Sequence, residues 1–396
     1  MSATVFNDLD AKSAPPCFHW KSDATQDSVS HLSPCPLEYR RDRRGLEEQR
    51  AWLAMPAHAF TPIRGRIDRW CFSSARLNNR LNDPEEREVL VHLSPEGIEA
   101  MEKGEELPVI VYLAPFTGSG PQRAGWKAFA ETLPQRHERL VASAAMKPVI
   151  LVMPDTFTSL GGNQYVDSPV TGQWSTWLAE DLKKELNRRY LTNGNFGLVG
   201  KSSGGYGAMV NAMLHPEAWH AIASHSGDIG FDLMYGGTWG ETITHLASHA
   251  SGEAYVRNIA ASPSMRSADF HALMMCALAA SYDPREANDT DDIGVCLPVD
   301  FETCQVDQDA WARWLAFDPL NMVEQHHQAL KGLSLCFIDC GNADQYNIHY
   351  GTRRFAKRLQ ELNVPHHYEE FAGTHSGIDH RLDVSLPLLS TALRSN

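Results

Sequence analysis

The sequence predicts an α/β fold with a mostly parallel sheet, helices on both faces of the sheet and a cap-like insertion. Three observations support this prediction. The chain has 396 residues, 43% of them hydrophobic, so it can bury a large core. From residue 108 onward, short apolar runs alternate with helical patterns. One of these apolar runs leads through the pattern G-x-S-x-G directly into a helix.

The order of these patterns divides the chain into an arm, a core and an insertion. Residues 1–60 are rich in Ser, Pro, Asp and Arg, and we expect an extended N-terminal arm with one helix over 45–53. The core is predicted to comprise 61–227 and 333–396. The alternation is interrupted over 228–332, which we interpret as an insertion. Such an insertion would lie over the carboxyl ends of the strands, where ligands bind, so we expect a cap or lid.

Each element of the core is predicted from its local pattern. Apolar runs of about four to eight residues are typical of buried strands, and longer segments with a helical period are typical of helices. In chain order we expect strands over 66–72, 87–93 and 108–114, a helix over 124–133, a strand over 149–153, a helix over 174–190, a strand over 196–199, a helix over 204–214 and a strand over 221–224. Helical patterns follow over 270–278 and 309–315, and then a strand over 333–338, a helix over 352–362, a strand over 367–371 and a helix over 384–393.

The pattern G-x-S-x-G is formed by Gly200, Ser202 and Gly204, between an apolar strand and a helix. A serine hydroxyl is a weak nucleophile and must be exposed on a sharp turn where a base can reach it, so the flanking residues must be small. Holding Ser202 in a sparsely populated backbone region costs roughly 1 to 3 kcal/mol. This context predicts a nucleophile elbow at Ser202. The backbone N–H of Ser203, at the start of the helix, is the first candidate donor of an oxyanion hole.

Gly200, Lys201 and Ser202 also resemble the end of a phosphate-binding P-loop. The spacing argues against that interpretation, because the P-loop pattern requires glycine at the position of Asn195. The residues that would form the phosphate cradle, 196–199, are an apolar run suited to a buried strand.

A nucleophilic serine of this kind is followed in the chain first by an acid and then by a histidine, as in α/β-hydrolases. Asp344 follows the strand over 333–338, and His375 lies on a loop of small residues after the strand over 367–371. We expect His375 to accept the proton of Ser202 and Asp344 to orient its imidazole. Asp339 is the alternative acid and His380 the alternative base. Taken singly, a turn-capping aspartate and a surface histidine are the simpler interpretations of Asp344 and His375.

The second oxyanion donor is expected after the strand over 108–114, from the N–H of Phe116 or Thr117. Four residues are candidates for substrate binding, namely Lys201, Tyr165, Thr117 and Trp174. An aromatic side chain in a glycine-rich loop is as often part of the packing as part of a binding site. The ammonium of Lys201 either attracts an acidic group of the substrate or points to solvent.

From about residue 63 to the C-terminus, the chain resembles the putative esterase family, which includes S-formylglutathione hydrolases (esterase D), feruloyl esterases, enterochelin esterases and mycolyltransferases. The resemblance is carried by the early strands before residue 108 and by residues 152–155, 164–168, 200–208, 339–345 and 373–375. It implies an α/β-hydrolase fold and ester chemistry, with Asp344 as the acid and Phe116 as the oxyanion donor. Two departures are Lys201, where the family usually has histidine, and the greater length of residues 228–332.

We therefore predict a serine carboxylic-ester hydrolase that forms an acyl-enzyme on Ser202 and needs neither a cofactor nor a metal. The alternatives are an acyltransferase on the same fold and a catalytically silent binding protein. A net charge of −14 argues against nucleic acids and anionic membranes as partners. The expected partners are a small-molecule ester and, as a candidate, further copies of the chain in a homo-oligomer. The start of the chain has neither a basic leader nor an apolar run, so we expect a cytoplasmic location.

Overall fold

The computed structural model describes residues 60–249, 252–285 and 296–394. All of them belong to one compact unit, His58–Asn396. The predicted N-terminal arm, apart from residue 60, and its helix over 45–53 lie outside the described residues.

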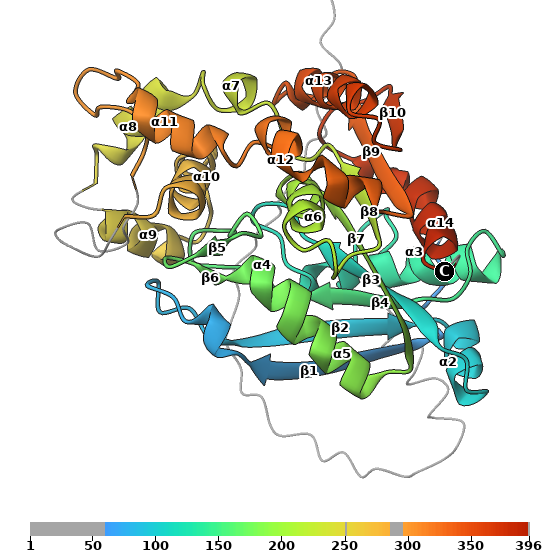
Figure 1. The fold of residues 1–396 in the computed structure, drawn as a ribbon. Coiled ribbons are helices and arrows are strands. Elements are labelled where there is room, and N and C mark those ends of the chain that lie inside the picture. Colours follow the sequence, from blue (N-terminus) through green and yellow to red (C-terminus); the bar gives the residue numbers. More distant parts are fainter. Residues whose placement is uncertain (1–59, 250–251, 286–295, 395–396) are drawn as a thin grey trace, which may run out of the picture. The chain divides into compact units, whose positions relative to one another are not determined.

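An eight-stranded mixed sheet forms the centre of the described structure (Figure 1), which confirms the mostly parallel sheet predicted from the sequence. The strands lie in the order β1-β2-β4-β3-β7-β8-β9-β10. Strand β2 pairs antiparallel with β1 and with β4, whereas all the later neighbours are parallel. The strands are β1 Arg66–Ser73, β2 Glu86–Leu93, β3 Leu107–Leu113, β4 Ile150–Pro154, β7 Thr192–Lys201, β8 Ala221–His225, β9 Leu335–Gly341 and β10 His367–Phe371. A short separate hairpin joins β5 Asp167–Ser168 and β6 Gly172–Gln173.

Helices connect the strands and fill the long segment between β8 and β9. They are α2 Pro95–Glu102, α3 Leu133–Ala142, α4 Trp174–Thr176, α5 Lys183–Arg189, α6 Ser203–Leu214, α7 Phe231–Met234, α8 Trp239–Leu246, α9 Gly252–Ala261, α10 Ser267–Tyr282, α11 Gln308–Leu315, α12 Pro319–Lys331, α13 Ile348–Glu361 and α14 Leu382–Ala392. A π-helical segment, Trp177–Leu182, joins α4 to α5, so the predicted helix over 174–190 is continuous. Among the described residues, no helix has both the length and the apolar character needed to cross a membrane.

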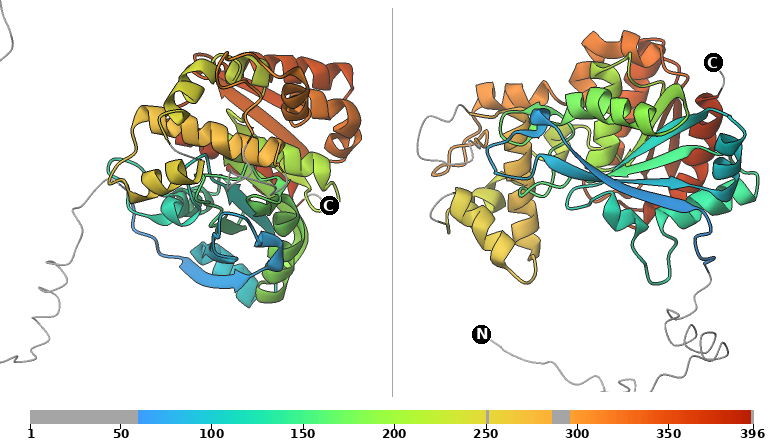
Figure 2. Two further views of the ribbon diagram at one scale, coloured as in Figure 1. Left: turned by 90° about the vertical axis from the view of Figure 1, so that its left-hand side faces the viewer. Right: turned by 90° about the horizontal axis from the view of Figure 1, so that it is seen from below.

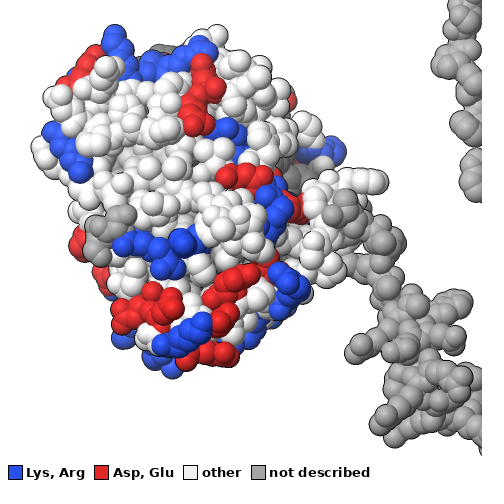
Figure 3. All heavy atoms as spheres, turned by 90° about the vertical axis from the view of Figure 1, so that its right-hand side faces the viewer, with Lys and Arg blue, Asp and Glu red and all other residues white. Residues whose placement is uncertain are grey.

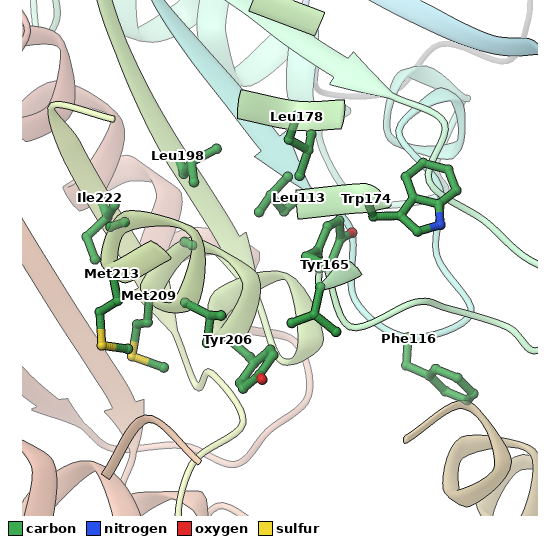
Figure 4. Packing of buried hydrophobic residues seen from close by; sticks show 14 of the residues in the cluster. Leu113, Phe116, Tyr165, Trp174, Leu178, Leu198, Tyr206, Met209, Met213 and Ile222 are labelled. Atoms are coloured by element: carbon green, nitrogen blue, oxygen red, sulfur yellow. The ribbon is translucent and has the colours of Figure 1, made fainter. Parts of the chain in front are cut away.

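The central strands are buried on both faces, and alternate residues of each strand belong to different core clusters. In β3, Val109 and Val111 pack in the cluster under α4 to α6, while Ile110 and Tyr112 pack in the cluster under α3 and α14. This period of two residues is the geometry of an extended strand. The helices therefore cover both faces of the sheet (Figure 2), and Figure 4 shows the packing between α6 and the neighbouring strands.

The helix predicted over 124–133 is wrong, because the helix on this side of the sheet is α3 and begins where the predicted helix ends. Thr132 caps α3 in a capping box with Gln135, and Pro134 lies in the first turn, where proline is well tolerated. Residues 121–124 form a short 3-10 turn instead. The apolar residues of 124–133 are spaced as in a helix, but the N-cap residue that begins the helix is Thr132.

The predicted insertion, residues 228–332, contains α7 to α12. Helices α8 to α11 form a group beside the sheet (Figures 1 and 2). Helix α12 differs from them, because it packs against α6 and α13 within the helical layer on the sheet. A role of this segment as a cap remains a prediction.

The surface formed by α3 and α14 carries both signs of charge. On the face drawn in Figure 3, which is the right-hand side of Figure 1, Lys and Arg side chains lie among those of Asp and Glu. Arg136 and Arg139 of α3 each contact Asp383 of α14, at 2.5 and 2.7 Å. These ion pairs join the two helices that cover the second face of the sheet.

The turn between β7 and α6 brings backbone segments close together near the carboxyl edge of the sheet. Ser202 has φ 55° and ψ −126°, a conformation that residues with a side chain rarely adopt. A Cβ atom on Gly200 would lie 2.3 Å from the backbone of Gly204, and a Cβ atom on Gly204 would lie 2.1 Å from the carbonyl oxygen of Leu113. The two glycines therefore allow β7, α6 and the end of β3 to meet around Ser202.

We expect the substitution Gly204→Ala to lower the free energy of unfolding by about 2 kcal/mol or more, because the backbone of β3 cannot move away from the added methyl group. Urea denaturation of the purified protein would measure the change. Gly240→Ala is the matched control. Gly240 lies in α8, and a methyl group added there would have no atom within 4 Å, so this variant should be as stable as the parent or more stable. Equal stability of the two variants would contradict the crowding at the turn.

Candidate active site

Five loops that leave neighbouring parallel strands meet at one edge of the sheet. Ser202 follows β7, Asp228 follows β8, Asp344 follows β9, His375 follows β10 and Phe116 follows β3. The strands β3, β7, β8, β9 and β10 are consecutive in the sheet, so their carboxyl ends lie side by side. Residues that are far apart in the sequence are therefore neighbours at this edge.

Ser202, His375 and Asp344 form a continuous chain of hydrogen bonds. The Nε2 atom of His375 lies 2.9 Å from the Oγ atom of Ser202, and its Nδ1 atom lies 2.8 Å from the Oδ2 atom of Asp344. A carboxylate only accepts hydrogen bonds, so Nδ1 carries the proton and Nε2 is left to accept the hydroxyl proton of Ser202. The arrangement suits transfer of a proton from the serine to the imidazole.

The loop after β9 holds the imidazole of His375 through three consecutive residues. Asp344 binds Nδ1, the side-chain oxygen of Gln345 accepts the backbone N–H of His375 at 3.0 Å, and the ring of Tyr346 packs edge-on against the imidazole at 4.9 Å. Asp344 is buried, and its second oxygen accepts the N–H of Tyr346 at 2.9 Å. These contacts fix the tautomer and the orientation of His375.

Two backbone N–H groups near Ser202 remain as candidate oxyanion donors. The N–H of Thr117 donates to the carbonyl of Gly161 at 2.8 Å and is therefore occupied. The N–H of Phe116 makes no hydrogen bond to any described residue. Ser203 opens α6, and N–H groups in the first turn of a helix lack an acceptor within the helix. Of the two donors considered in the loop after β3, Phe116 is thus the free one.

A cavity of about 170 Å³ opens at Ser202 and His375. Its other lining residues are Pro115, Phe116, Lys201, Met234, Phe270, Met274 and Tyr346. The cavity wall is mostly apolar and contains one cation, Lys201, and no carboxylate. Burial lowers the pKa of the half-buried Lys201 ammonium from its ordinary value. Within the described ranges, no group of three or more His, Cys, Asp or Glu side chains is arranged to hold a metal ion.

Thr117 lies at a second and larger cavity of about 780 Å³. This cavity is lined mostly by apolar residues of α9, α10, the turn between these helices and the loops at 80–82, 117 and 157–161, together with Arg80 and Arg257. The ring of Phe116 packs edge-on against Phe270 at 5.3 Å and belongs to the wall of the smaller cavity.

Tyr165 and Trp174 lie outside both cavities, and their positions correct the substrate-binding role predicted for them. The hydroxyl of Tyr165 donates to the carbonyl of Ala114 at 2.7 Å, and its ring packs against Gly207 of α6. Trp174 is fully buried against Trp177. Both rings belong to the core (Figure 4), and Tyr165 holds the strand end that precedes the Phe116 loop.

Asp228 also contacts Ser202, and this contact was not predicted from the sequence. Its carboxylate lies 3.3 Å from the Oγ atom of Ser202 and accepts hydrogen bonds from Ser203 Oγ and Tyr235 OH, each at 3.2 Å. Burial raises the pKa of the Asp228 carboxyl. The hydroxyl of Ser202 has a single proton, so Asp228 competes with His375 for it at the longer distance. The available signal was its place directly after β8, the strand beside the elbow strand.

A second Ser-His-Asp set lies nearby but is fully buried. His225 contacts Asp339 through Nδ1 and Ser385 through Nε2, each at 2.8 Å. Asp339 also accepts a hydrogen bond from Arg381 at 2.6 Å. The side chains of Ser385 and Asp339 are inaccessible, so no substrate can reach them. Asp339, the alternative acid, therefore links β8, β9 and α14, and does not contact His375.

His380, the alternative base, is exposed and is held by the carbonyl of Gly377, with Nδ1 3.3 Å from the oxygen. The structure brings His375 rather than His380 to Ser202. Asp339 and His380, the alternative acid and base, thus contact other groups and do not reach Ser202 or His375.

Comparison with known proteins identifies relatives of this chain. Residues 82–384 match the model of a family described as putative esterase. Similar solved structures include a ferulic acid esterase, with 17% identity, a TM-score of 0.52 and coverage of 84% of this chain and 100% of that chain. An S-formylglutathione hydrolase from Agrobacterium tumefaciens has 17% identity, a TM-score of 0.51 and coverage of 84% of this chain and 97% of that chain. No curated protein sequence matches the chain. At these identities the structures support the fold alone.

We expect Asp228→Asn to gain stability relative to the parent as the pH rises from 4.5 to 7. A carboxyl whose pKa is raised by folding binds its proton more tightly in the folded state, so its ionisation destabilises the fold as the pH rises above the unfolded pKa of about 4. Asparagine cannot ionise and removes this loss. Urea denaturation at both pH values would measure the difference in the free energy of unfolding between variant and parent.

The same substitution at Asp300 provides the control. Asp300 is exposed, and a hydrogen bond from Thr303 lowers its pKa, so Asp300→Asn should show no gain of stability with pH. If the stability difference for Asp228→Asn stayed constant or shrank between pH 4.5 and 7, Asp228 would not carry the predicted charge penalty.

Proposed function

The chain belongs to the putative esterase family and is a carboxylic ester hydrolase, and on this premise we propose that it cleaves a small-molecule ester through an acyl-enzyme on Ser202. One observation carries the proposal, namely the hydrogen-bond chain from Ser202 through His375 to Asp344 at 2.9 and 2.8 Å. The position of Ser202 on a strained turn at the wall of a cavity supports it further.

In the proposed first half of the reaction, the Oγ atom of Ser202 attacks the carbonyl carbon of the ester. A bond forms between Oγ and the carbon, the carbonyl π electrons move to oxygen, and the hydroxyl proton passes to Nε2 of His375. The carboxylate of Asp344 stabilises the resulting imidazolium, because it already accepts the Nδ1 proton. The imidazolium then gives its proton to the departing alcohol as the bond from carbon to the alcohol oxygen breaks.

In the second half, water replaces the alcohol. His375 takes a proton from the water as its oxygen attacks the acyl carbon, and returns the proton to Oγ of Ser202 as the acyl-enzyme bond breaks. The products are the carboxylic acid and the free enzyme. In both halves His375 acts first as a base and then as an acid, and Ser202 is the nucleophile in the first half and the leaving group in the second.

The negative charge that develops on the carbonyl oxygen requires donors that are already in place. The N–H groups of Phe116 and Ser203 are the proposed pair, since both lie beside Ser202 and neither has another acceptor among the described residues. Loss of one such donor costs on the order of 3 kcal/mol in the transition state. The positive end of the α6 dipole at Ser203 also stabilises the negative charge on this oxygen.

We expect Ser202→Ala and His375→Ala each to lower kcat for a p-nitrophenyl ester by about 10⁴-fold or more, because each removes a group on which the other depends. Asp344→Asn should lose a similar or somewhat smaller factor, since it disturbs the tautomer of His375. Single-turnover and steady-state assays of the purified variants would measure these losses.

The second Ser-His-Asp set supplies the control for this experiment. Ser385→Ala alters a serine with the same kinds of partner, but the side chain is buried, so turnover should stay within about threefold of the parent at a temperature where the variant is folded. Ser202→Ala should also abolish labelling by a fluorophosphonate, whereas Ser385→Ala should not. Substantial activity in Ser202→Ala would contradict the proposed acyl-enzyme.

A further inference from the structure

The cavity at Ser202 contains a cation for which the described chain supplies no counter-ion. Lys201 immediately precedes the nucleophile in sequence, and its side chain lines the cavity. It is half-buried, and its ammonium forms no hydrogen bond or ion pair with any described residue. Removing a charge from water is costly unless a partner replaces the water, so an unpaired lysine at this position needs an explanation.

The carboxylates closest to Lys201 are already bound to other groups. Asp379 contacts Arg123 at 2.8 Å and Lys127 at 3.0 Å, and although burial opposes the effect, these two cations lower the pKa of Asp379. Asp344 is bound to His375 at 2.8 Å. The surroundings of Lys201 therefore include two further cations, and the acids that could neutralise it are occupied.

Asp228 does not fill this role either. Its carboxylate contacts the hydroxyls of Ser202, Ser203 and Tyr235, is almost fully buried and does not line the cavity. An anion that enters the cavity would thus meet Lys201 without a carboxylate in the wall. The remaining wall is formed by apolar side chains, among them Met234, Phe270 and Met274.

Building on the proposed function, we propose that Lys201 binds a carboxylate carried by the substrate, so that the enzyme acts on short esters with one free carboxylate. A single lysine next to apolar walls provides one positive charge, which matches the single charge of a carboxylate. A phosphate group carries roughly −1.5 to −2 charges and would need further donors that the wall does not provide. The cavity of about 170 Å³ is below the range of about 300 to 1,000 Å³ that is common for drug-sized ligands, so the half of the ester that enters it is short.

The carboxylate can belong to either half of the ester, and two pairs of substrates distinguish these cases. In the first pair, ethyl hydrogen succinate carries the carboxylate on the acyl half, and ethyl butyrate is its neutral counterpart. In the second pair, the butyrate ester of 3-hydroxypropanoate carries it on the alcohol half, and propyl butyrate is the neutral counterpart. Hydrolysis of each ester releases one acid group, which titration at constant pH follows directly.

The measured quantity is the ratio of kcat/KM for the charged ester to kcat/KM for the neutral ester. We expect Lys201→Met to lower this ratio by about 10- to 100-fold in the pair whose carboxylate meets Lys201, because a charge-assisted hydrogen bond is lost. Lys201→Arg should retain most of the ratio, since it keeps the positive charge. Lys103→Met is the control, because Lys103 is a surface lysine paired with Glu99 outside the cavity, and it should leave the ratio unchanged.

The proposal is overturned if Lys201→Met leaves the ratio unchanged in both pairs, or if Lys103→Met lowers it as much as Lys201→Met does. A failure of the underlying function is visible separately. If Ser202→Ala still hydrolyses the neutral esters, the acyl-enzyme is wrong. If neutral esters are hydrolysed only when Ser202 is present while the ratio does not depend on Lys201, the carboxylate site alone is wrong.

Discussion

The sharp turn at Ser202 is the constraint on which the rest of the candidate site depends. The residue has φ 55°, and the turn closes because Gly200 and Gly204 let strand and helix backbones approach to distances that a Cβ atom would prevent. The strain costs roughly 1 to 3 kcal/mol. It is sustained by α6, whose residues Ser203 to Met213 are all buried. Both elements that flank Ser202 are thus anchored in the core, and they hold its backbone at the edge of the sheet.

Two Ser-His-Asp sets with nearly the same hydrogen-bond distances show that the arrangement alone does not define a catalytic site. The set of Ser202 and His375 borders a cavity, and its histidine contacts the serine from a loop. The set of Ser385 and His225 has its serine inside helix α14 and its acid bound to Arg381, with no access from outside. The difference lies in accessibility and in the charge environment of the acid. The buried set joins two strands to a helix.

The aspartates around the site illustrate how neighbours decide the behaviour of one residue type. Asp344 contacts an imidazole, Asp228 accepts hydrogen bonds from hydroxyl groups, and Asp379 contacts two cations. Burial raises the pKa of Asp228 although His375 and three hydroxyl groups oppose the shift, whereas Arg123 and Lys127 lower the pKa of Asp379 despite its burial. Because Asp379 is shared by two cations, Lys201 is left without a partner among the described residues. In the proposal above, a carboxylate of the substrate balances the charge of Lys201.

The sequence alone determined the features that depend on local patterns. The strands and most helices of the core and the sharp turn at Ser202 follow from short-range periodicity and turn residues. The order of serine, acid and histidine was a prediction from the order known in α/β-hydrolases. Proximity required the tertiary structure. It shows that Asp344, the acid predicted from the sequence, contacts His375, whereas Asp339 contacts His225. It also brings Asp228 to Ser202 and places Tyr165 in the core. The physical reason is that a pattern within a short stretch of chain records which face of an element is apolar, whereas contacts between strand ends depend on how distant segments pack.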